Sequence, residues 1–462
     1  MKKIKIGYLP MYLKLYDDTN PAKRDPMVAH MKTLISMLEA HGMEVAAVEP
    51  CRVREEFDVA VRRFEDEEVV AVVTQHLAYS PSLESIDALK RLRVPLIILD
   101  TTPEYSLIDK AAYEKGISDN HGIHGVQDMC NLLRRSGCPY HLCVGHALHS
   151  PVVAEVAGFC RAAQAAWEYR HARVGSVGRT FPGMGDFQIP EEQLSREVGA
   201  KVIPLSRESA EQYLAQVTPE DIEAEIAENA ARFTVEVSNT DNYRESIRAG
   251  LAVRKWVEDQ RLTAMTVNFL DVDACKLPKM PFVECSKAMA RGVGYAGEGD
   301  VLTAGLVGAL RSVYPLTTFT EVFCPDWKHD VLLLSHMGEV NVDLAQWKPV
   351  LRDVPFNFNS CGDTVAAYAC LRPGKAALVN LAPMEKGLKL IIVPVEMLDR
   401  GLEYGAYRYA VQGWMKTQKP LREFLKAYSI EGGTHHSALV YDADMDEMEA
   451  FGRMMGFEVV RF

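Results

Sequence analysis

Two glutamates and three histidines in the second half of the chain are of types that can bind a cation or move a proton. Glu298 lies in GVGYAGEGD (292–300), Glu321 lies in TTFTEVF, His336 closes DVLLLSH, and His435 and His436 lie together in GGTHHSALVY. All stand at tight turns or at the ends of apolar runs, where α/β and barrel scaffolds carry sites. Each also has an ordinary structural explanation, since a strand-end histidine or a lone glutamate is often only hydrogen-bonded or solvated.

The glycine stretch around Glu298 matches G-x-G-x-x-G through Gly292, Gly294 and Gly297. A dinucleotide-binding loop needs a strand that ends just before its first glycine. The preceding ECSKAMARG has helical composition, so we expect a helix-turn-helix here, and a nicotinamide oxidoreductase is a poor reading. No G-K-[ST] follows, which excludes a Walker loop. We expect the glycines to present Glu298 into a cleft and Asp300 to cap the following helix.

The surrounding sequence predicts the scaffold that must position these residues. Up to residue 171, short β-branched runs such as EEVVAVVTQ and PLIILDTT alternate with stretches that carry apolar residues at helical spacing. That alternation predicts a doubly wound, Rossmann-like parallel sheet, and it restarts near residue 173. After about residue 316 the runs become strand-like with polar turns. We therefore expect two α/β domains (1–171 and 172–316) and a mostly antiparallel, β-rich C-terminal domain (317–462).

Composition narrows the class of protein. The 462 residues carry 51 basic and 63 acidic side chains, a net charge of -12, and no basic run that could follow a phosphate backbone, so neither nucleic acid nor an anionic membrane is an expected partner. The start of the chain has no secretory h-region, and no stretch reaches the roughly 18 apolar residues of a membrane span. The ten cysteines form no C-x-x-C pair, so we expect buried thiols in a cytoplasmic protein.

Four motifs, in this order along the chain, carry a resemblance to a known family. YAGEGDVLTAGL, TTFTEVF, LLLSHMGEV and GGTHHSALV resemble the L-arabinose isomerase and L-fucose isomerase superfamily, most closely its arabinose isomerase branch. The resemblance implies an aldose/ketose isomerase that acts on a pentose or deoxyhexose through a cis-enediol.

The resemblance also implies a site. Glu298, Glu321, His336 and His436 would bind a divalent metal, usually manganese, and the two glutamates would also act as the acid/base pair. Carboxylate oxygens with imidazole nitrogens suit Mn²⁺, whereas a structural zinc favours thiolates. An octahedral ion with four protein ligands keeps two positions open for adjacent sugar oxygens. His435 is expected to contact the substrate.

The family forms hexamers in which a neighbour's N-terminal domain completes each sugar pocket. By resemblance, His124 and Gln75 would contact sugar hydroxyls from the adjacent subunit, although His124 could equally begin a helix. TQHL (74–77) and HGVQD (124–128) depart from the family's segments, so the sugar is left open. The main alternative is a cytoplasmic sugar-binding protein without catalysis, because two doubly wound domains around a cleft also describe solute receptors.

Overall fold

Five parallel strands form the sheet of the N-terminal part of the chain. The computed structural model describes residues 3–108, 117–399 and 412–462, which divide into two compact units, Met1–Gln164 and Ala165–Phe462. In the first unit the strand order is β2-β1-β3-β4-β5, with bounds Ile4–Met11 (β1), Met43–Ala47 (β2), Val72–His76 (β3), Leu96–Asp100 (β4) and His141–Val144 (β5). Every residue of β3 and β4 is buried, as expected for a parallel sheet covered on both faces.

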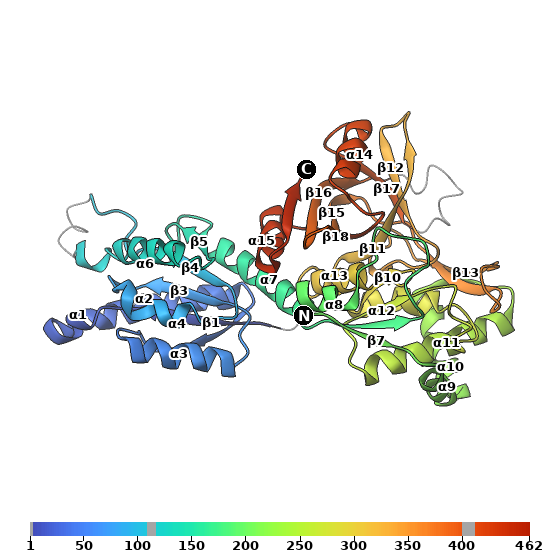
Figure 1. The fold of residues 1–462 in the computed structure, drawn as a ribbon, viewed down its shortest axis with the longest axis horizontal. Coiled ribbons are helices and arrows are strands. Elements are labelled where there is room, and N and C mark those ends of the chain that lie inside the picture. The colour runs from blue at the N-terminus through green and yellow to red at the C-terminus, as the bar shows by residue number, and fades with distance from the viewer. Residues whose placement is uncertain (1–2, 109–116, 400–411) are drawn as a thin grey trace. The chain divides into compact units, whose positions relative to one another are not determined.

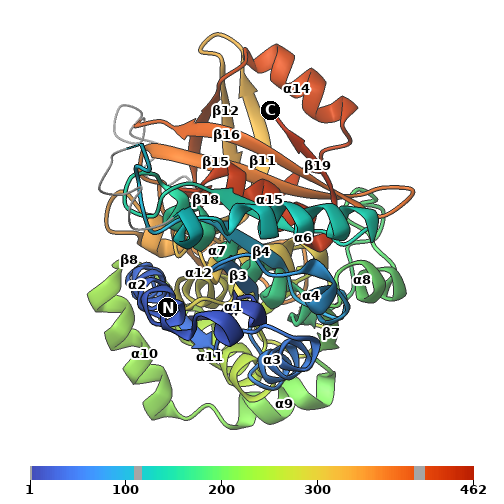
Figure 2. The ribbon, with the colours of Figure 1, turned by 90° about the vertical axis from the view of Figure 1, so that its left-hand side faces the viewer.

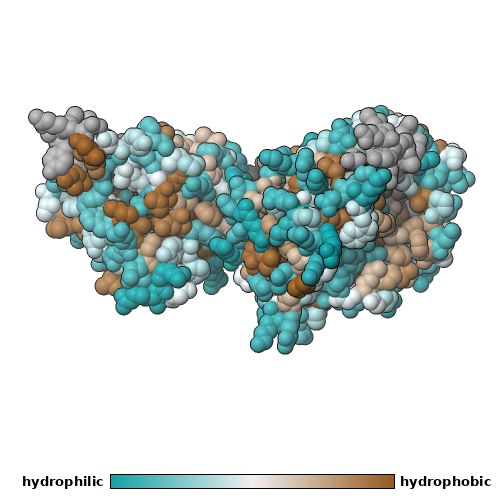
Figure 3. Space-filling model, turned by 90° about the horizontal axis from the view of Figure 1, so that it is seen from above, coloured by the Kyte–Doolittle hydropathy of each residue, from teal (hydrophilic) through white to brown (hydrophobic). Residues whose placement is uncertain are grey.

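Helices connect these strands and cover the sheet (Figure 1). They are α1 (Lys14–Thr19), α2 (Arg24–Ala40), α3 (Arg54–Asp66), α4 (Ser82–Leu89), α6 (Ile123–Arg135) and α7 (Val152–Arg170), the last of which continues into the second unit. The edge strand β5 leaves two apolar side chains bare, since Leu142 is 44% and Val144 is 60% exposed. The face shown in Figure 3 carries hydrophobic patches on this unit among hydrophilic side chains.

The second unit begins with a four-stranded parallel sheet in the order β10-β9-β6-β7. Its strands are β6 (Arg173–Val177), β7 (Lys201–Pro204), β9 (Ala264–Val267) and β10 (Gly294–Gly297). The helices of this part are α8 (Glu191–Glu197), α9 (Arg207–Ala215), α10 (Pro219–Arg232), α11 (Thr240–Asp259), α12 (Phe282–Arg291) and α13 (Val301–Arg311). The expected helix-turn-helix at the glycine stretch is wrong, because β10 lies within it. This strand begins after Gly292 rather than before it, so the stretch is still not a dinucleotide fingerprint.

A curved, mostly antiparallel sheet forms the rest of the second unit. Its order is β15-β18-β11-β12-β17-β16-β19, and an additional β15–β16 pairing closes six of the strands into a barrel. Figure 2 shows several of these strands curving together with α14 beside them. The bounds are Thr317–Asp326 (β11), Val331–Ser335 (β12), Gly374–Pro383 (β15), Leu388–Met397 (β16), Gly413–Thr417 (β17), His436–Tyr441 (β18), Glu458–Arg461 (β19), Leu421–Ile430 (α14) and Met445–Met455 (α15).

A third, small sheet in the second unit has the order β14-β13-β8, from Thr234–Glu236 (β8), Val350–Val354 (β13) and Thr364–Tyr368 (β14). This sheet pairs one strand that lies before residue 316 with two strands that lie after it. The domain boundaries at 171 and 316 stay a prediction. The expected fold class is confirmed: parallel sheets with flanking helices are followed by a barrel-like antiparallel sheet. Among the described residues, no helix has the length and apolarity that crossing a membrane would need.

Candidate metal centre

Adjacent strand ends bring the acids and imidazoles of the second unit together. The strand β11 lies between β12 and β18, and its residue Glu321 pairs with Ser335 on one side and with His436 on the other. His336 follows β12 directly, and its ring centroid lies 5.7 Å from that of His436. Glu298 follows β10 at the carboxyl end of the parallel sheet, the edge at which open α/β sheets bind ligands.

Glu298 approaches both neighbouring histidines. Its Oε2 atom lies 3.5 Å from Nε2 of His436 and 4.0 Å from Nε2 of His435. One ligand atom from each of these three residues lies within 4.8 Å of the others, so the group could hold a metal ion. Glu321 and His336 lie beside this group of three but are not part of it.

The backbone at Glu298 adopts a conformation that side chains rarely tolerate, with φ 62°. Such a left-handed residue costs on the order of 1–3 kcal/mol and persists only where its surroundings fix it. Here the backbone N–H of Glu298 donates to Val267 O (2.8 Å), and the N–H of Phe181 donates to Glu298 O (2.9 Å). A Cβ atom on Gly299 would lie 2.5 Å from Arg179 O, so the chain following β6 packs directly on this turn.

Each imidazole of the site is held by a carboxylate at its Nδ1 atom. His336 pairs with Glu339 (2.7 Å), and His436 pairs with Asp300 (3.0 Å). A neutral ring that donates from Nδ1 keeps a lone pair on Nε2, which is how metal-binding histidines are usually oriented. Nε2 of His436 is fully buried and has no hydrogen-bond partner among the described residues. The arrangement therefore fits a cation as the missing partner of that nitrogen.

The two glutamates differ in how readily they bind a proton. Burial raises the pKa of Glu321 above its ordinary value, and the nearby histidines offset only part of this effect. Burial also acts on Glu298, but the electrostatic attraction of the surrounding imidazoles of His435, His336 and His436 leaves its pKa below the ordinary value. Neighbouring carboxylates with pKa values pushed apart are typical of acid/base pairs.

Aromatic and glycine residues shape the wall of the site. The ring of Phe187 stacks on His436, with centroids 4.8 Å apart and an interplanar angle of 5°, and Phe319 meets the same imidazole edge-on. A Cβ atom on Gly297 would lie 2.5 Å from Cε1 of His336. The imidazoles thus have little room to rotate.

Three carboxylates that bond the site histidines were not predicted from the sequence to do so. Asp300 was expected to cap a helix, and it does accept a hydrogen bond from Thr303 N at the start of α13, but its second oxygen also bonds His436. Glu339 follows His336 by three residues, a spacing that could have suggested the pair. Asp186 bonds His435 from 249 positions away, and no local signal in the sequence indicates that contact.

The two expected substrate residues of the N-terminal domain lie in the first unit, and their role stays a prediction. Gln75 is buried in β3, where its Oε1 accepts a hydrogen bond from the Tyr8 hydroxyl (2.5 Å). His124 is exposed in the first turn of α6, as the helix-start alternative expected, and its ring meets those of Tyr79 and His121 at 5.7 and 4.9 Å.

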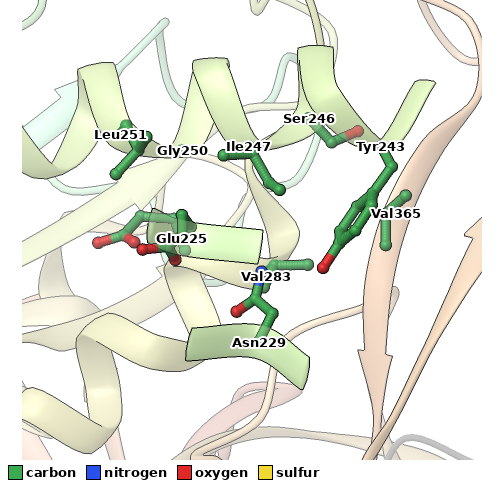
Figure 4. A pocket seen from close by; sticks show the side chains of 10 residues that line it. Glu225, Asn229, Tyr243, Ser246, Ile247, Gly250, Leu251, Val283 and Val365 are labelled. Carbon is green, nitrogen blue, oxygen red and sulfur yellow. The ribbon is translucent and has the colours of Figure 1, made fainter. Parts of the chain in front are cut away.

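A small cavity in the second unit is not the candidate site. It lies among α10, α11, α12 and β14 (Figure 4), and no residue of the acid and imidazole group lines it. Two buried polar atoms at its wall, Nδ2 of Asn229 and the hydroxyl oxygen of Tyr243, lack hydrogen-bond partners. At its edge Glu225 is held by Arg254 and by Lys287, so the cavity adjoins a structural charge network.

Comparison with known proteins finds one family along most of the second unit. The L-arabinose isomerase central domain matches residues 194–314, and the L-arabinose isomerase C-terminal domain matches residues 316–458. The L-arabinose isomerase of Aeromonas salmonicida is 23% identical over 476 residues, covering 100% of this chain and 94% of the relative. That of Geobacillus thermodenitrificans is 25% identical, covering 85% and 81%.

Among solved structures, a periplasmic solute-binding protein from Actinobacillus succinogenes with bound D-allose is similar over 67% of this chain and 92% of its own. It is 12% identical with a TM-score of 0.18, a likeness too weak to carry an argument.

Proposed function

Because this chain belongs to the L-arabinose isomerase-like family and is an aldose–ketose isomerase, we propose that it depends on a divalent metal, Mn²⁺. We propose further that it converts an L-arabinose-like pentose or deoxyhexose through a cis-enediol. The observation that carries the proposal is the meeting of Glu298, Glu321, His336 and His436 at adjacent strand ends: Glu298 Oε2 lies 3.5 Å from Nε2 of His436, which pairs with Glu321 and lies ring to ring with His336. The alternative of a sugar-binding protein without catalysis is set aside because the family is one of isomerases, a class of intramolecular oxidoreductases.

We assign the metal to Glu298, Glu321, His336 and His436. Glu298, His336 and His436 are buried and Glu321 is partly buried. Both imidazoles are held through Nδ1 by buried carboxylates, which leaves Nε2 for a ligand bond. A bound divalent cation would polarise the sugar carbonyl and stabilise the negative charge that develops there during isomerisation.

The protein's own groups would move the proton between C1 and C2. Glu298 and Glu321 would form the acid/base pair, in which a carboxylate takes the proton from one carbon and returns it to the other. Phe187 and Phe319 pack against the imidazoles and keep bulk water from that side of the site.

The proposal extends to assembly and location. We propose a homohexamer in which His124 and Gln75 of one subunit contact the sugar held by its neighbour, as the family resemblance implies. We also propose a cytoplasmic location. All ten cysteines are free thiols, which is the state expected in a reducing compartment.

A panel of aldoses incubated with the protein tests the proposed function. The protein is stripped with EDTA, reloaded with Mn²⁺, Mg²⁺ or Zn²⁺, and assayed for ketose formation with pentoses and 6-deoxyhexoses. Ketose formation that disappears with EDTA and returns with Mn²⁺ is expected for an L-arabinose-like sugar. Turnover that persists after the metal has been removed, or no turnover of any sugar in the panel, would contradict the proposal.

A further inference from the structure

We propose that Asp186 is a positioning residue that fixes His435 at the solvent-facing rim of the metal centre, where His435 contacts the sugar and does not hold the metal. The inference rests on the proposed function, and it assigns a role to a residue outside the predicted site.

Asp186 holds His435 at two points through one carboxylate oxygen. Its Oδ2 accepts a hydrogen bond from the backbone N–H of His435 (3.1 Å) and another from Nδ1 of the ring (2.6 Å). Because both the backbone and the ring are held, rotation about the side-chain bonds is restricted. The remaining ring nitrogen, Nε2, then faces the Glu298 carboxylate at 4.0 Å.

Exposure separates this pair from the two other carboxylate–imidazole pairs of the site. The side chains of His336 and Glu339 are 2% and 1% exposed, and those of His436 and Asp300 are fully buried. The side chains of His435 and Asp186 are 29% and 38% exposed. A sugar that arrives from solvent therefore meets His435 before it reaches the buried groups. An imidazole at that place can donate or accept a hydrogen bond with a hydroxyl group.

The segment that carries Asp186 is anchored to the centre at further points. It follows β6, and near its start the Thr180 hydroxyl donates to Gly299 O (3.2 Å), while Phe181 N donates to Glu298 O. At its end Phe187, which is 1% exposed, stacks on His436. These contacts join the turn of Glu298 to the start of β18, and Asp186 is the charged member among them. The segment thus sets the position of His435 relative to Glu298.

The test compares Asp186→Ala and Asp186→Asn with a matched control, Asp326→Ala. Asp326 makes the same kind of pair on an exposed hairpin, because its Oδ2 bonds Nδ1 of His329 (2.7 Å) and its Oδ1 accepts backbone N–H groups. Three quantities are measured for each variant: Mn²⁺ affinity from the EPR signal of the free ion, binding of L-arabinitol to the Mn²⁺-loaded protein by calorimetry, and kcat and KM with the aldose that turns over best.

Asp186→Ala is expected to keep the wild-type Mn²⁺ affinity and to lose about tenfold or more in L-arabinitol affinity and kcat/KM, because the imidazole that contacts the sugar is no longer held in position. Asp186→Asn, which keeps the size of the side chain, guards against misfolding of the alanine variant and is expected to fall between that variant and wild type. Asp186→Glu is expected to recover part of the loss, and Asp326→Ala to match wild type throughout.

Two results would overturn the inference. A fall in Mn²⁺ affinity in both Asp186→Ala and Asp186→Asn would mean that His435 helps to bind the metal. Unchanged sugar binding and turnover in both variants would mean that Asp186 has no positioning role. A wild-type protein that binds L-arabinitol but converts no aldose would contradict the proposed function alone, and the binding measurements would still decide the role of Asp186. A wild-type protein that binds Mn²⁺ but neither polyol nor aldose would refute both.

Discussion

At the scale of single residues, Glu298 combines a left-handed backbone with a carboxylate that faces two imidazoles. Its backbone is fixed from both sides by hydrogen bonds with Val267 and Phe181, so the side chain leaves the turn in one direction. Strain of this kind is kept where the surroundings determine it, and it recurs at functional sites. The strained backbone of Glu298 is thus consistent with its proposed role in the functional site.

Glu298→Gln is expected to fold like wild type and to lose nearly all isomerase activity. The amide keeps the size of the side chain but can neither accept the proton nor contribute a negative charge to a cation, and general acid/base help alone is worth about 10²- to 10⁴-fold. Ketose formation, Mn²⁺ affinity and the melting temperature of the metal-free protein check this result. Near wild-type turnover would remove Glu298 from the mechanism.

His76 in the first unit supports a prediction about pH. It is almost wholly buried at the end of β3, and neither ring nitrogen has a hydrogen-bond partner within residues 3–108, 117–399 and 412–462. Burial lowers the pKa of His76 from 6.5 to about 3. Below about pH 6.5 the unfolded chain therefore binds a proton that the folded chain does not, and stability falls by up to about 1.4 kcal/mol per pH unit as the pH drops towards 3.

His76→Leu is expected to remove this loss, because leucine has no group to protonate. Urea unfolding of the first unit, followed at pH 7.5 and pH 4.5, should show a larger decline for wild type than for the variant. His41→Leu is the control, since His41 is exposed at the end of α2 and this change should leave the decline as it is in wild type. Equal declines in wild type and His76→Leu would show that His76 is hydrated in solution.

At the scale of elements, the site depends on how closely β10 approaches the end of β12. Gly297 ends β10, and its missing side chain leaves space for the His336 ring, whose Cε1 and Nε2 atoms would lie 2.5 and 2.8 Å from an added Cβ. Distances this short cannot be accommodated, so either the strand or the ring must move. The glycine is therefore required by the neighbouring His336 ring and not by its own backbone.

Gly297→Ala is expected to shift His336 and to weaken Mn²⁺ binding by an amount in the ~10- to 100-fold range seen when a ligand loses its orientation. The matched control is Gly413→Ala in β17, where an added Cβ would make only an ordinary 3.7 Å contact with Met397. Metal titration compares the Mn²⁺ affinities of the two variants, and circular dichroism checks that both are folded. Equal affinities in the two variants would mean that the His336 ring moves aside without consequence.

The strands that carry Glu321, His336 and His436 could be predicted because each is a run of β-branched and apolar residues bounded by turns. The strand β10 could not, since three of the four residues of Gly-Tyr-Ala-Gly are of types depleted from strands, and the segment is extended because it pairs with β9. Asp186 could not be found either. Its segment has no periodicity, and its partner His435 is defined only by the folded chain. The local sequence pattern thus predicted the site residues that lie on strands. The contacts made by loop residues could be identified only in the tertiary structure.

At the scale of the whole molecule, the proposed hexamer can be tested through its shared pockets. Chains carrying His124→Ala are co-expressed with chains carrying Glu298→Gln, after each variant alone has been found inactive. If a neighbour's N-terminal domain completes each pocket, random mixing restores both intact residues to about a quarter of the pockets, and ketose formation returns to a similar fraction.

Mass photometry on the mixed sample should give a species of about six times the 51.5 kDa chain mass. An inactive mixture of the same mass, with Mn²⁺ bound, would mean that His124 does not act in a neighbour's pocket. A wild-type monomer that remains active on dilution would exclude the shared pocket altogether.

The bare edge of the first sheet has a consequence for handling the protein. The strand β5 ends its sheet with one row of backbone groups facing outward, and Leu142 and Val144 stand exposed along it. A sheet edge with apolar side chains and few charges can pair with an extended segment of another chain, which leads to aggregation. A fragment that ends at residue 164 is thus expected to precipitate on concentration, and the substitution Val144→Lys is expected to keep the fragment in solution.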